Sequence, residues 1–126
     1  MTDPIADMII RIKNAIAVKK TTVEVRYSKL KEEILKIFKK KGVIKDFEKI
    51  EEGKKSFLRI TLNYPAKYTN FKRISKPGRR IYIKAKDIQL VKQGYGFGII
   101  STSKGIFTES EAKKQNLGGE YILEVF

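Results

Sequence analysis

The segment over residues 94–105 places the strongest constraint on how this chain can fold. It reads Gly-Tyr-Gly-Phe-Gly, then Ile-Ile, then Ser-Thr-Ser, then Lys-Gly. The glycines lead into residues that favour a strand, so we expect a tight, glycine-shaped entry into a short apolar strand with three hydroxyls at its tip. Small hydroxyls both donate and accept hydrogen bonds, and they can therefore meet phosphate oxygens, ribose hydroxyls and base edges at short range.

These hydrogen-bonding properties indicate RNA binding, but the segment also has a purely structural interpretation. Hydroxyl runs at strand ends also satisfy the backbone of turns, and Tyr95 and Phe97 would pack into a core. A dinucleotide-binding loop is excluded, because the third glycine has the wrong spacing and no helix follows. The RNA-recognition strand pattern is also excluded, because only about half of its positions match and the helices come in the wrong order along the chain.

The charge of the chain indicates a polyanionic partner. Its 28 basic and 14 acidic residues give a net charge of +14. Up to Tyr64 there are 16 basic and 9 acidic residues, and after it 12 and 5, so each half carries +7. Charge spread over both halves is typical of a folded protein that lies against a polyanion along much of its surface. The Lys-rich surface of a heat-stable protein is the alternative, but such a surface should carry matching Glu.

Composition excludes several classes of function. With 126 residues, 41% of them hydrophobic, the chain can bury one ordinary core or two small ones. It has neither Cys nor His, which removes disulfides, thiolate nucleophiles, zinc-finger spacing and the commonest general base. We therefore expect no enzyme, no metal and no cofactor. No apolar run reaches the ~18 residues of a membrane helix and no signal peptide is evident, so we expect a soluble, cytoplasmic protein with no membrane partner.

Residues 1–64 predict an α/β unit with the order helix, strand, helix, strand, strand. Asp3-Pro4 marks the start of the first helix, and an alternating strand over residues 23–27 follows it. The apolar face of that helix is Ile5, Met8, Ile9, Ile12 and Ile16. Strands over residues 43–50 and 57–62 form a hairpin, in whose turn Gly53 can take a positive φ.

The second helix of this unit has clear ends. Ser28 can cap its start, and Gly42 ends it after a run of three lysines at residues 39–41. Its predicted apolar stripe is Leu30, Ile34, Leu35, Ile37 and Phe38. The lysine run either forms a solvated last turn that suits the helix dipole or contacts RNA directly.

Residues 65–126 predict a β-rich unit, and we place the boundary between two domains after Tyr64, where residues 63–70 break the periodicity. Residues 71–75 lead into a Lys-Pro-Gly turn that presents Arg79 and Arg80 before a strand over residues 81–84. These arginines suit phosphate, but turn arginines are also ordinary surface residues. A capping box predicts one short helix from Thr108, and residues 120–126 predict a terminal strand.

Four motifs in order resemble a known family. They are residues 3–8 with residues 11–15, the Ser-Lys-Pro-Gly-Arg-Arg-Ile-Tyr run at 75–82, the Ser-Thr-Ser-Lys-Gly run at 101–105, and Gly-Gly-Glu at 118–120. Together they are similar to the bacterial form of the eighth small-subunit ribosomal protein, over residues 2–126. Departures from that pattern are substitutions at apolar positions and leave the expected RNA roles intact.

This resemblance implies a two-domain α+β protein, a monomer outside the ribosome, that binds the central domain of small-subunit ribosomal RNA directly and helps to seed platform assembly. It implies neighbouring ribosomal proteins five and twelve as partners. It also implies RNA-contacting residues. In the C-terminal unit these are Ser101, Thr102, Ser103, Lys104, Gly105, Tyr82, Gly119 and Glu120, with Arg79, Arg80 and Lys84 nearby. In the N-terminal unit they are Arg11, Lys13, Asn14, Lys29 and Lys31, on a second RNA segment.

Glu120 is the unusual member, because an acid near a polyanion is unfavourable unless it accepts a hydrogen bond or orients a neighbour. We expect it to orient the Ser-Thr-Ser strand. One alternative function stays open, namely repression of translation by binding to the operon's own messenger RNA, which the family carries out in some bacteria.

Overall fold

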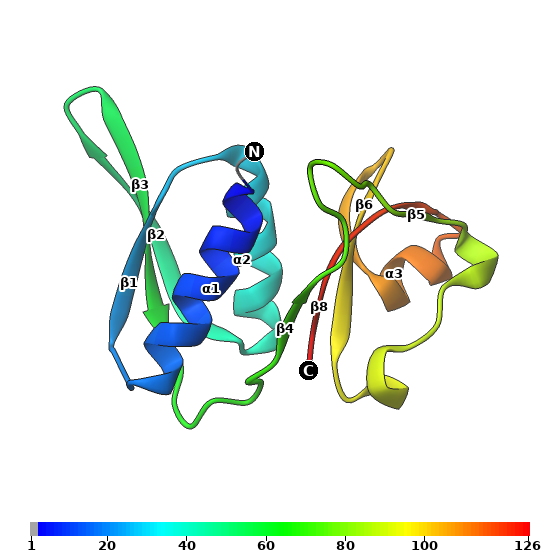
Figure 1. The fold of residues 1–126 in the computed structure, drawn as a ribbon, viewed down its shortest axis with the longest axis horizontal. Coiled ribbons are helices and arrows are strands. Elements are labelled where there is room, and N and C mark those ends of the chain that lie inside the picture. The colour runs from blue at the N-terminus through cyan, green and yellow to red at the C-terminus, as the bar shows by residue number, and fades with distance from the viewer. Residues whose placement is uncertain (1–2) are drawn as a thin grey trace. The chain divides into compact units, whose positions relative to one another are not determined.

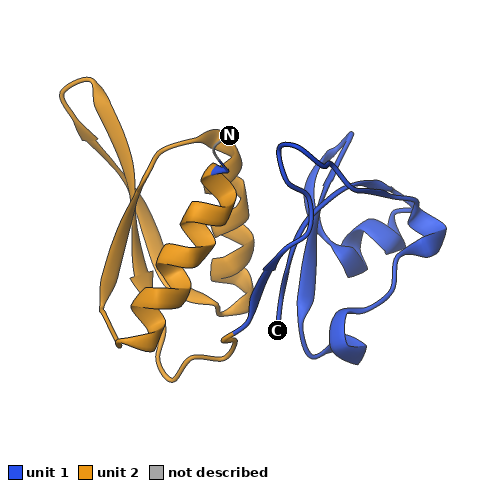
Figure 2. Ribbon diagram, in the orientation of Figure 1, with its two compact units in different colours: residues 1–3, 70–126 blue, residues 4–69 orange. Residues whose placement is uncertain are grey.

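The computed structural model describes residues 3–126, which form two compact units (Figure 1, Figure 2). One unit comprises residues 4–69, and the other comprises residues 70–126 together with Asp3. The first combines helices with a three-stranded sheet, and the second is a five-stranded antiparallel sheet with one short α-helix. The predicted α+β class is therefore confirmed.

The unit of residues 4–69 has the predicted order of elements. They are α1 (Pro4–Ala17), β1 (Thr22–Arg26), α2 (Lys29–Lys41), β2 (Ile44–Glu52) and β3 (Lys55–Leu62). The strands pair antiparallel in the order β1-β3-β2, and both helices lie along one face of this sheet (Figure 1). Because the sheet has one covered face, its apolar residues gather there, and Val25, Leu58 and Ile60 are buried.

Local sequence signals account for the ends of these elements. Pro4 opens α1, and the Ser28 hydroxyl accepts a 3.1 Å hydrogen bond from the backbone N–H of Lys31 at the start of α2. Gly42 ends α2 in the left-handed region with φ 81°, and Gly53 turns the β2–β3 hairpin with φ 61°. The predicted apolar face of α1 is buried except at Ile16, which is only partly covered.

The C-terminal unit is built around its last strand. Its elements are β4 (Phe71–Arg73), β5 (Tyr82–Ile83), β6 (Phe97–Thr102), β7 (Gly105–Thr108), α3 (Glu109–Lys114) and β8 (Gly119–Val125), with 3-10 turns at Ala85–Asp87 and Val91–Gly94. The strand order is β4-β8-β6-β7, and β5 also pairs with β8. Since β4 and β5 pair with successive stretches of β8, the residues between them form a loop at the edge of the sheet.

The structure of this unit differs from the sequence interpretation at three places. Tyr95 does not pack into the core but is 61% exposed, whereas Phe97 is buried as predicted. Of residues 71–75, which lead into the Lys-Pro-Gly turn, only the first three form a strand, because β4 ends at Arg73. No local pattern indicated β7, a four-residue strand that pairs with β6 in a hairpin directly before α3.

Close packing explains the glycine-rich entry to β6. A Cβ carbon on Gly96 would overlap the carbonyl oxygen of Val125, and one on Gly98 would overlap the hydroxyl of Tyr121. On one side of the sheet, α3 packs over a buried cluster of Ile88, Ile100 and Ala112. The neighbouring side chains Phe97, Ile99, Leu123 and Val125 of β6 and β8 are buried too, so the candidate site lies where the two strands end, at the partly exposed pair of Ser101 and Glu120.

Candidate nucleic-acid interface

The hydroxyl run lies at the end of β6 and in the turn that leads to β7. Thr102 pairs with Gly105 across this turn. The Thr102 hydroxyl donates to the Gly105 carbonyl at 2.9 Å and accepts from the Lys104 backbone N–H at 3.1 Å. For Thr102, therefore, the structural interpretation of the run holds, because its hydroxyl closes the turn.

The two serines on either side of Thr102 differ from it. Within residues 3–126, the structure gives neither the Ser101 nor the Ser103 hydroxyl a hydrogen-bond partner, and Ser103 is exposed. A hydroxyl without an internal partner can donate to and accept from a ligand at no cost in lost protein contacts. These two hydroxyls are the ones available for recognition.

Strand register places three of the predicted residues in one row. Glu120 on β8 is paired with Ser101 on β6, and on its other side with Tyr82 on β5. Directly paired residues of antiparallel strands project from the same face of a sheet, so these side chains are neighbours. We call Tyr82, Glu120 and Ser101 the recognition row. Tyr82 stands at one end of this row and is 71% exposed.

Gly119 lies beside this row for a steric reason. A Cβ carbon at Gly119 would overlap the carbonyl oxygen of Ser101, and one at Gly118 would overlap the carbonyl oxygen of Ile83 on β5. The Gly-Gly pair thus lets β8 lie tightly between its neighbours. Its role in the site is to shape the strands that carry the row.

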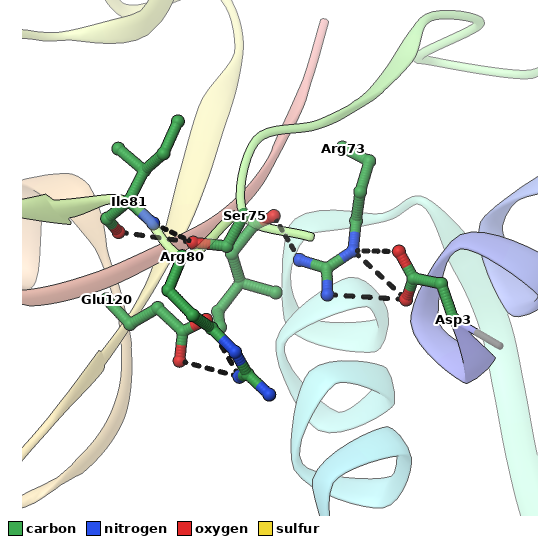
Figure 3. Close-up of polar contacts among 7 residues, drawn as sticks. Asp3, Arg73, Ser75, Arg80, Ile81 and Glu120 are labelled. Carbon is green, nitrogen blue, oxygen red and sulfur yellow. Dashed lines mark hydrogen bonds and ion pairs between the residues drawn. The ribbon is translucent and has the colours of Figure 1, made fainter. Parts of the chain in front are cut away.

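The carboxylate of Glu120 is held by a cation that local sequence did not indicate. Arg80 Nη1 lies 3.1 Å from Glu120 Oε2, and the Glu120 side chain is only 15% exposed (Figure 3). The expected role of Glu120 was to orient the Ser-Thr-Ser strand, and its register opposite Ser101 is compatible with that role. The ion pair adds a second one, because it fixes Arg80 next to the row.

Further cations surround this face of the C-terminal unit. Arg79, Lys84 and Lys104 are all exposed, and they come from three separate segments around the row. Arg79 lies in the Pro-Gly turn, whose two backbone hydrogen bonds join Lys76 and Arg79 at 2.9 and 3.0 Å. Such a grouping of cations around polar hydroxyls is typical of a surface that contacts phosphates and bases together.

In the N-terminal unit, Arg11, Lys13 and Asn14 lie exposed on α1, and Lys29 lies exposed at the start of α2. Arg11 is not unengaged, since its Nε donates to Asp7 Oδ2 at 2.9 Å one helical turn away. An exposed pair of this kind contributes little to stability and can open for a phosphate.

Lys31 is placed differently from the other predicted cations. It is only 6% exposed, and its ammonium donates to the Arg26 carbonyl at 3.1 Å. Burial lowers the pKa of Lys31 below its ordinary 10.5, although the nearby Asp7 carboxylate opposes the shift. Its helical spacing from Ile34 and Leu35 was the sequence signal for burial. We leave it outside the proposed surface.

Several other basic residues are engaged within the protein. Arg59 on β3 lies between Glu24 and Glu48 on the two flanking strands, at 3.1 and 3.6 Å. Lys39 pairs with Asp46 at 3.0 Å, and this hydrogen bond, with the backbone N–H of Phe47, lowers the pKa of the Asp46 carboxyl. These contacts favour the structural interpretation of the lysine run for Lys39.

The described residues offer little for catalysis. Across residues 3–126, no group of three or more His, Cys, Asp or Glu side chains could hold a metal ion, and no helix there is long and apolar enough to cross a membrane. Glu109 is a buried carboxylate, but it accepts a hydrogen bond from the Gly98 backbone N–H at the entry to β6. It therefore supports the backbone of the site.

Comparison with known proteins decides the family. A family model described as Ribosomal protein S8 matches residues 3–126. The chain is 48% identical to the small ribosomal subunit protein uS8 of Enterococcus faecalis and to that of Geobacillus kaustophilus, covering 100% of this chain and 98% of each relative. It is 45% identical to the uS8 protein of Thermus aquaticus, covering 100% of this chain and 99% of the relative.

The chain belongs to the ribosomal protein S8 family. It is a structural constituent of the small ribosomal subunit in the cytoplasm, and the S8 family is not one of enzymes. The resemblance drawn from four sequence motifs is confirmed. Which residues of this chain contact RNA stays a prediction.

Proposed function

We propose that the chain binds the central domain of small-subunit ribosomal RNA directly, through the recognition row and the Ser103 hydroxyl of its C-terminal unit. The observation that carries this proposal is the register of Tyr82, Glu120 and Ser101 on three adjacent strands, with Arg80 held by the carboxylate of Glu120, the middle member of the row. The row joins an exposed aromatic ring, hydrogen-bonding groups and a cation within one sheet face.

The chemistry of the row suits an irregular RNA helix. The deep groove of A-form RNA is closed to side chains, so specific recognition occurs where bases are unstacked or splayed. Short hydroxyls at Ser101 and Ser103 allow the backbone to approach such a site closely, and the exposed Tyr82 ring can stack on a base or a ribose. Because Arg80 neutralises Glu120, the acid need not repel the phosphates.

We propose a division of work between two domains, with the boundary in the segment that follows β3. The C-terminal domain supplies selectivity, whereas Arg11, Lys13, Asn14 and Lys29 of the N-terminal domain contact a second RNA segment. Neutralising phosphates with exposed cations gives affinity that depends strongly on salt and hardly on sequence.

Titration of the full-length protein with two RNAs tests this proposal. One is a fragment of the central domain of small-subunit RNA, and the other is an unrelated duplex of equal length, each measured at several salt concentrations. We expect tight, selective binding to the fragment and weak, steeply salt-dependent binding to the duplex. Equal affinity for both RNAs at every salt concentration would show that the chain has no specific site.

Crosslinking in cells, followed by sequencing of the bound RNA, separates two targets. We expect crosslinks in the central domain of the ribosomal RNA. Reads from the protein's own operon messenger RNA would support the repressor alternative in addition. The expected contacts with small-subunit proteins five and twelve stay predictions of the resemblance.

A further inference from the structure

We propose that the buried Ser75 is a positioning residue for RNA binding, which fixes Arg80 beside the recognition row without touching RNA itself. This inference rests on the proposed function, since it concerns how the same surface is held in shape. Ser75 is buried, and its residue type alone did not indicate a role in RNA binding.

The Ser75 hydroxyl makes two hydrogen bonds to one residue. Its Oγ accepts from the Ile81 backbone N–H at 2.8 Å and donates to the Ile81 carbonyl at 3.1 Å (Figure 3). Ser75 is fully buried, so water cannot replace either bond. The hydroxyl thus closes the loop of residues 76–80 at its two ends.

Both ends of this loop are also attached to the same residue of β8. The Ser75 N–H donates to the Tyr121 carbonyl at 3.1 Å, and the Tyr121 N–H donates to the Ile81 carbonyl at 2.8 Å. Ser75, Ile81 and Tyr121 therefore form a closed set of hydrogen bonds. Because Tyr121 directly follows Glu120, this set lies next to the recognition row.

The geometry of the loop determines where its cations lie. Arg80 directly precedes the fixed Ile81, and its guanidinium reaches the Glu120 carboxylate at 3.1 Å. At the other end of the loop, Lys76 and Arg79 exchange two backbone hydrogen bonds across the Pro-Gly turn. A long cation held in this way loses less conformational freedom on binding a phosphate than one on a mobile loop.

A methyl group in place of the buried Ser75 hydroxyl would remove the acceptor of the Ile81 N–H. Such a loss is relieved by local opening of the chain, which lets water reach the N–H. We expect this opening to release the loop and, with it, the defined position of Arg80. Arginine would keep its charge, so binding to any polyanion would persist while binding to the specific site weakened.

A double-mutant cycle on the full-length protein tests the inference. The variants are Ser75→Ala, Arg80→Ala and their combination, titrated with the central-domain fragment and with the unrelated duplex. Ser110→Ala is the matched control, because its hydroxyl lies in α3 of the same unit and, within residues 3–126, forms a hydrogen bond only with Thr108. Amide hydrogen exchange at Ile81 reports directly on the opening of the loop.

We expect Ser75→Ala to speed exchange at Ile81 and to lower affinity for the fragment by roughly 10-fold, as for one lost hydrogen bond, with little change for the duplex. In the Arg80→Ala background, the same change should lower affinity by less than about 2-fold, because the two residues act through one contact. Ser110→Ala should leave both affinities unchanged.

Two outcomes would overturn the inference. Equal losses from Ser75→Ala with and without Arg80 would show a general effect on folding, and faster exchange at unchanged affinity would show that the loop need not be fixed. If Ser75→Ala does not fold, Ser75→Cys, of similar size but weak in hydrogen bonding, goes through the same cycle. A wild-type protein that does not prefer the fragment would instead refute the proposed function, and this inference with it.

Discussion

Gly119 lies so close to the carbonyl oxygen of Ser101 that a Cβ carbon on it would overlap that atom. The two residues belong to neighbouring strands, so a side chain at Gly119 would force β8 away from β6 beside the recognition row. We expect Gly119→Ala to destabilise the protein by ~2–3 kcal/mol, as overpacking against backbone does, and to weaken specific RNA binding. Urea unfolding and RNA titration measure the two effects.

Gly53→Ala is the control for this change. Gly53 turns the β2–β3 hairpin, and a Cβ carbon there would meet nothing within 4 Å. We expect Gly53→Ala to lower the free energy of unfolding by about 1 kcal/mol, because alanine is strained in a left-handed backbone, and to leave specific RNA affinity unchanged. Equal effects of the two substitutions on RNA binding would remove the steric role of Gly119.

The two hydroxyls of the β6–β7 turn should respond differently to removal. Ser103→Ala deletes a hydroxyl with no partner within residues 3–126, so we expect unchanged stability and a loss of ~1–3 kcal/mol in specific affinity. Thr102→Val removes the hydrogen bonds to Gly105 and Lys104, so it should lower the free energy of unfolding by about 1 kcal/mol, in contrast to Ser103→Ala. Thermal unfolding and titration with the central-domain fragment separate the two variants.

The slope of log affinity against log salt should be the same for Ser103→Ala and the wild type, because no charged contact to phosphate is removed. Unchanged specific affinity in a folded Ser103→Ala protein would move recognition elsewhere on the C-terminal unit. The structure thereby divides the hydroxyl run, which sequence alone treated as one feature.

The features that could be predicted from the sequence are those set by residues close together in the chain. Pro4, Ser28, Gly42 and Thr108 act within one helical turn, and each was identified correctly from local spacing. β7 was missed because its four residues lie between a turn and a capping box and are defined only by pairing with β6.

The site shows the same limit more strongly. The Arg80–Glu120 ion pair joins residues 40 positions apart, and it depends on the register of β5 and β8, which no local pattern encodes. Lys31 is a different case. The resemblance implied an RNA contact for it, whereas its spacing from the buried Ile34 and Leu35 is the local pattern that indicates burial.

Glu120→Gln distinguishes positioning from simple electrostatics. Removing an acid from a surface that faces a polyanion should tighten binding if charge alone matters. If the carboxylate instead fixes Arg80, we expect affinity for the central-domain fragment to fall roughly 3- to 10-fold, as for the loss of a charge-assisted hydrogen bond. Tighter binding to both RNAs by this variant would favour the electrostatic account.

Lys31→Met tests the burial of that ammonium. We expect specific affinity to stay within about 2-fold of the wild type, as for a position away from the interface, whereas Lys29→Ala should weaken binding to all RNAs alike. Selective loss of the central-domain fragment with Lys31→Met would return this residue to the interface.

The same variant also has a pH signature. The lowered pKa means that the folded protein gives up the Lys31 proton before the unfolded chain does. Wild-type stability relative to Lys31→Met should therefore rise with pH, over the window between the lowered pKa and 10.5. Urea unfolding of both proteins across alkaline pH measures this difference.

Tyr121 should show the opposite dependence on pH. Burial, followed by the nearby Glu124 and Glu109 carboxylates, raises the pKa of its phenol well above the ordinary value of 10. Above that pH the unfolded chain loses this proton while the folded protein keeps it, so stability falls as pH rises past about 10. The stability difference between wild type and Tyr121→Phe should shrink in the same range, when both are unfolded with urea at successive pH values. In the folded wild type, Tyr121 should contribute no phenolate absorbance just above pH 10, and the Tyr121→Phe variant identifies its share of the absorbance. A Tyr121 phenolate that forms at its ordinary pKa in the folded protein would contradict its burial against Gly98.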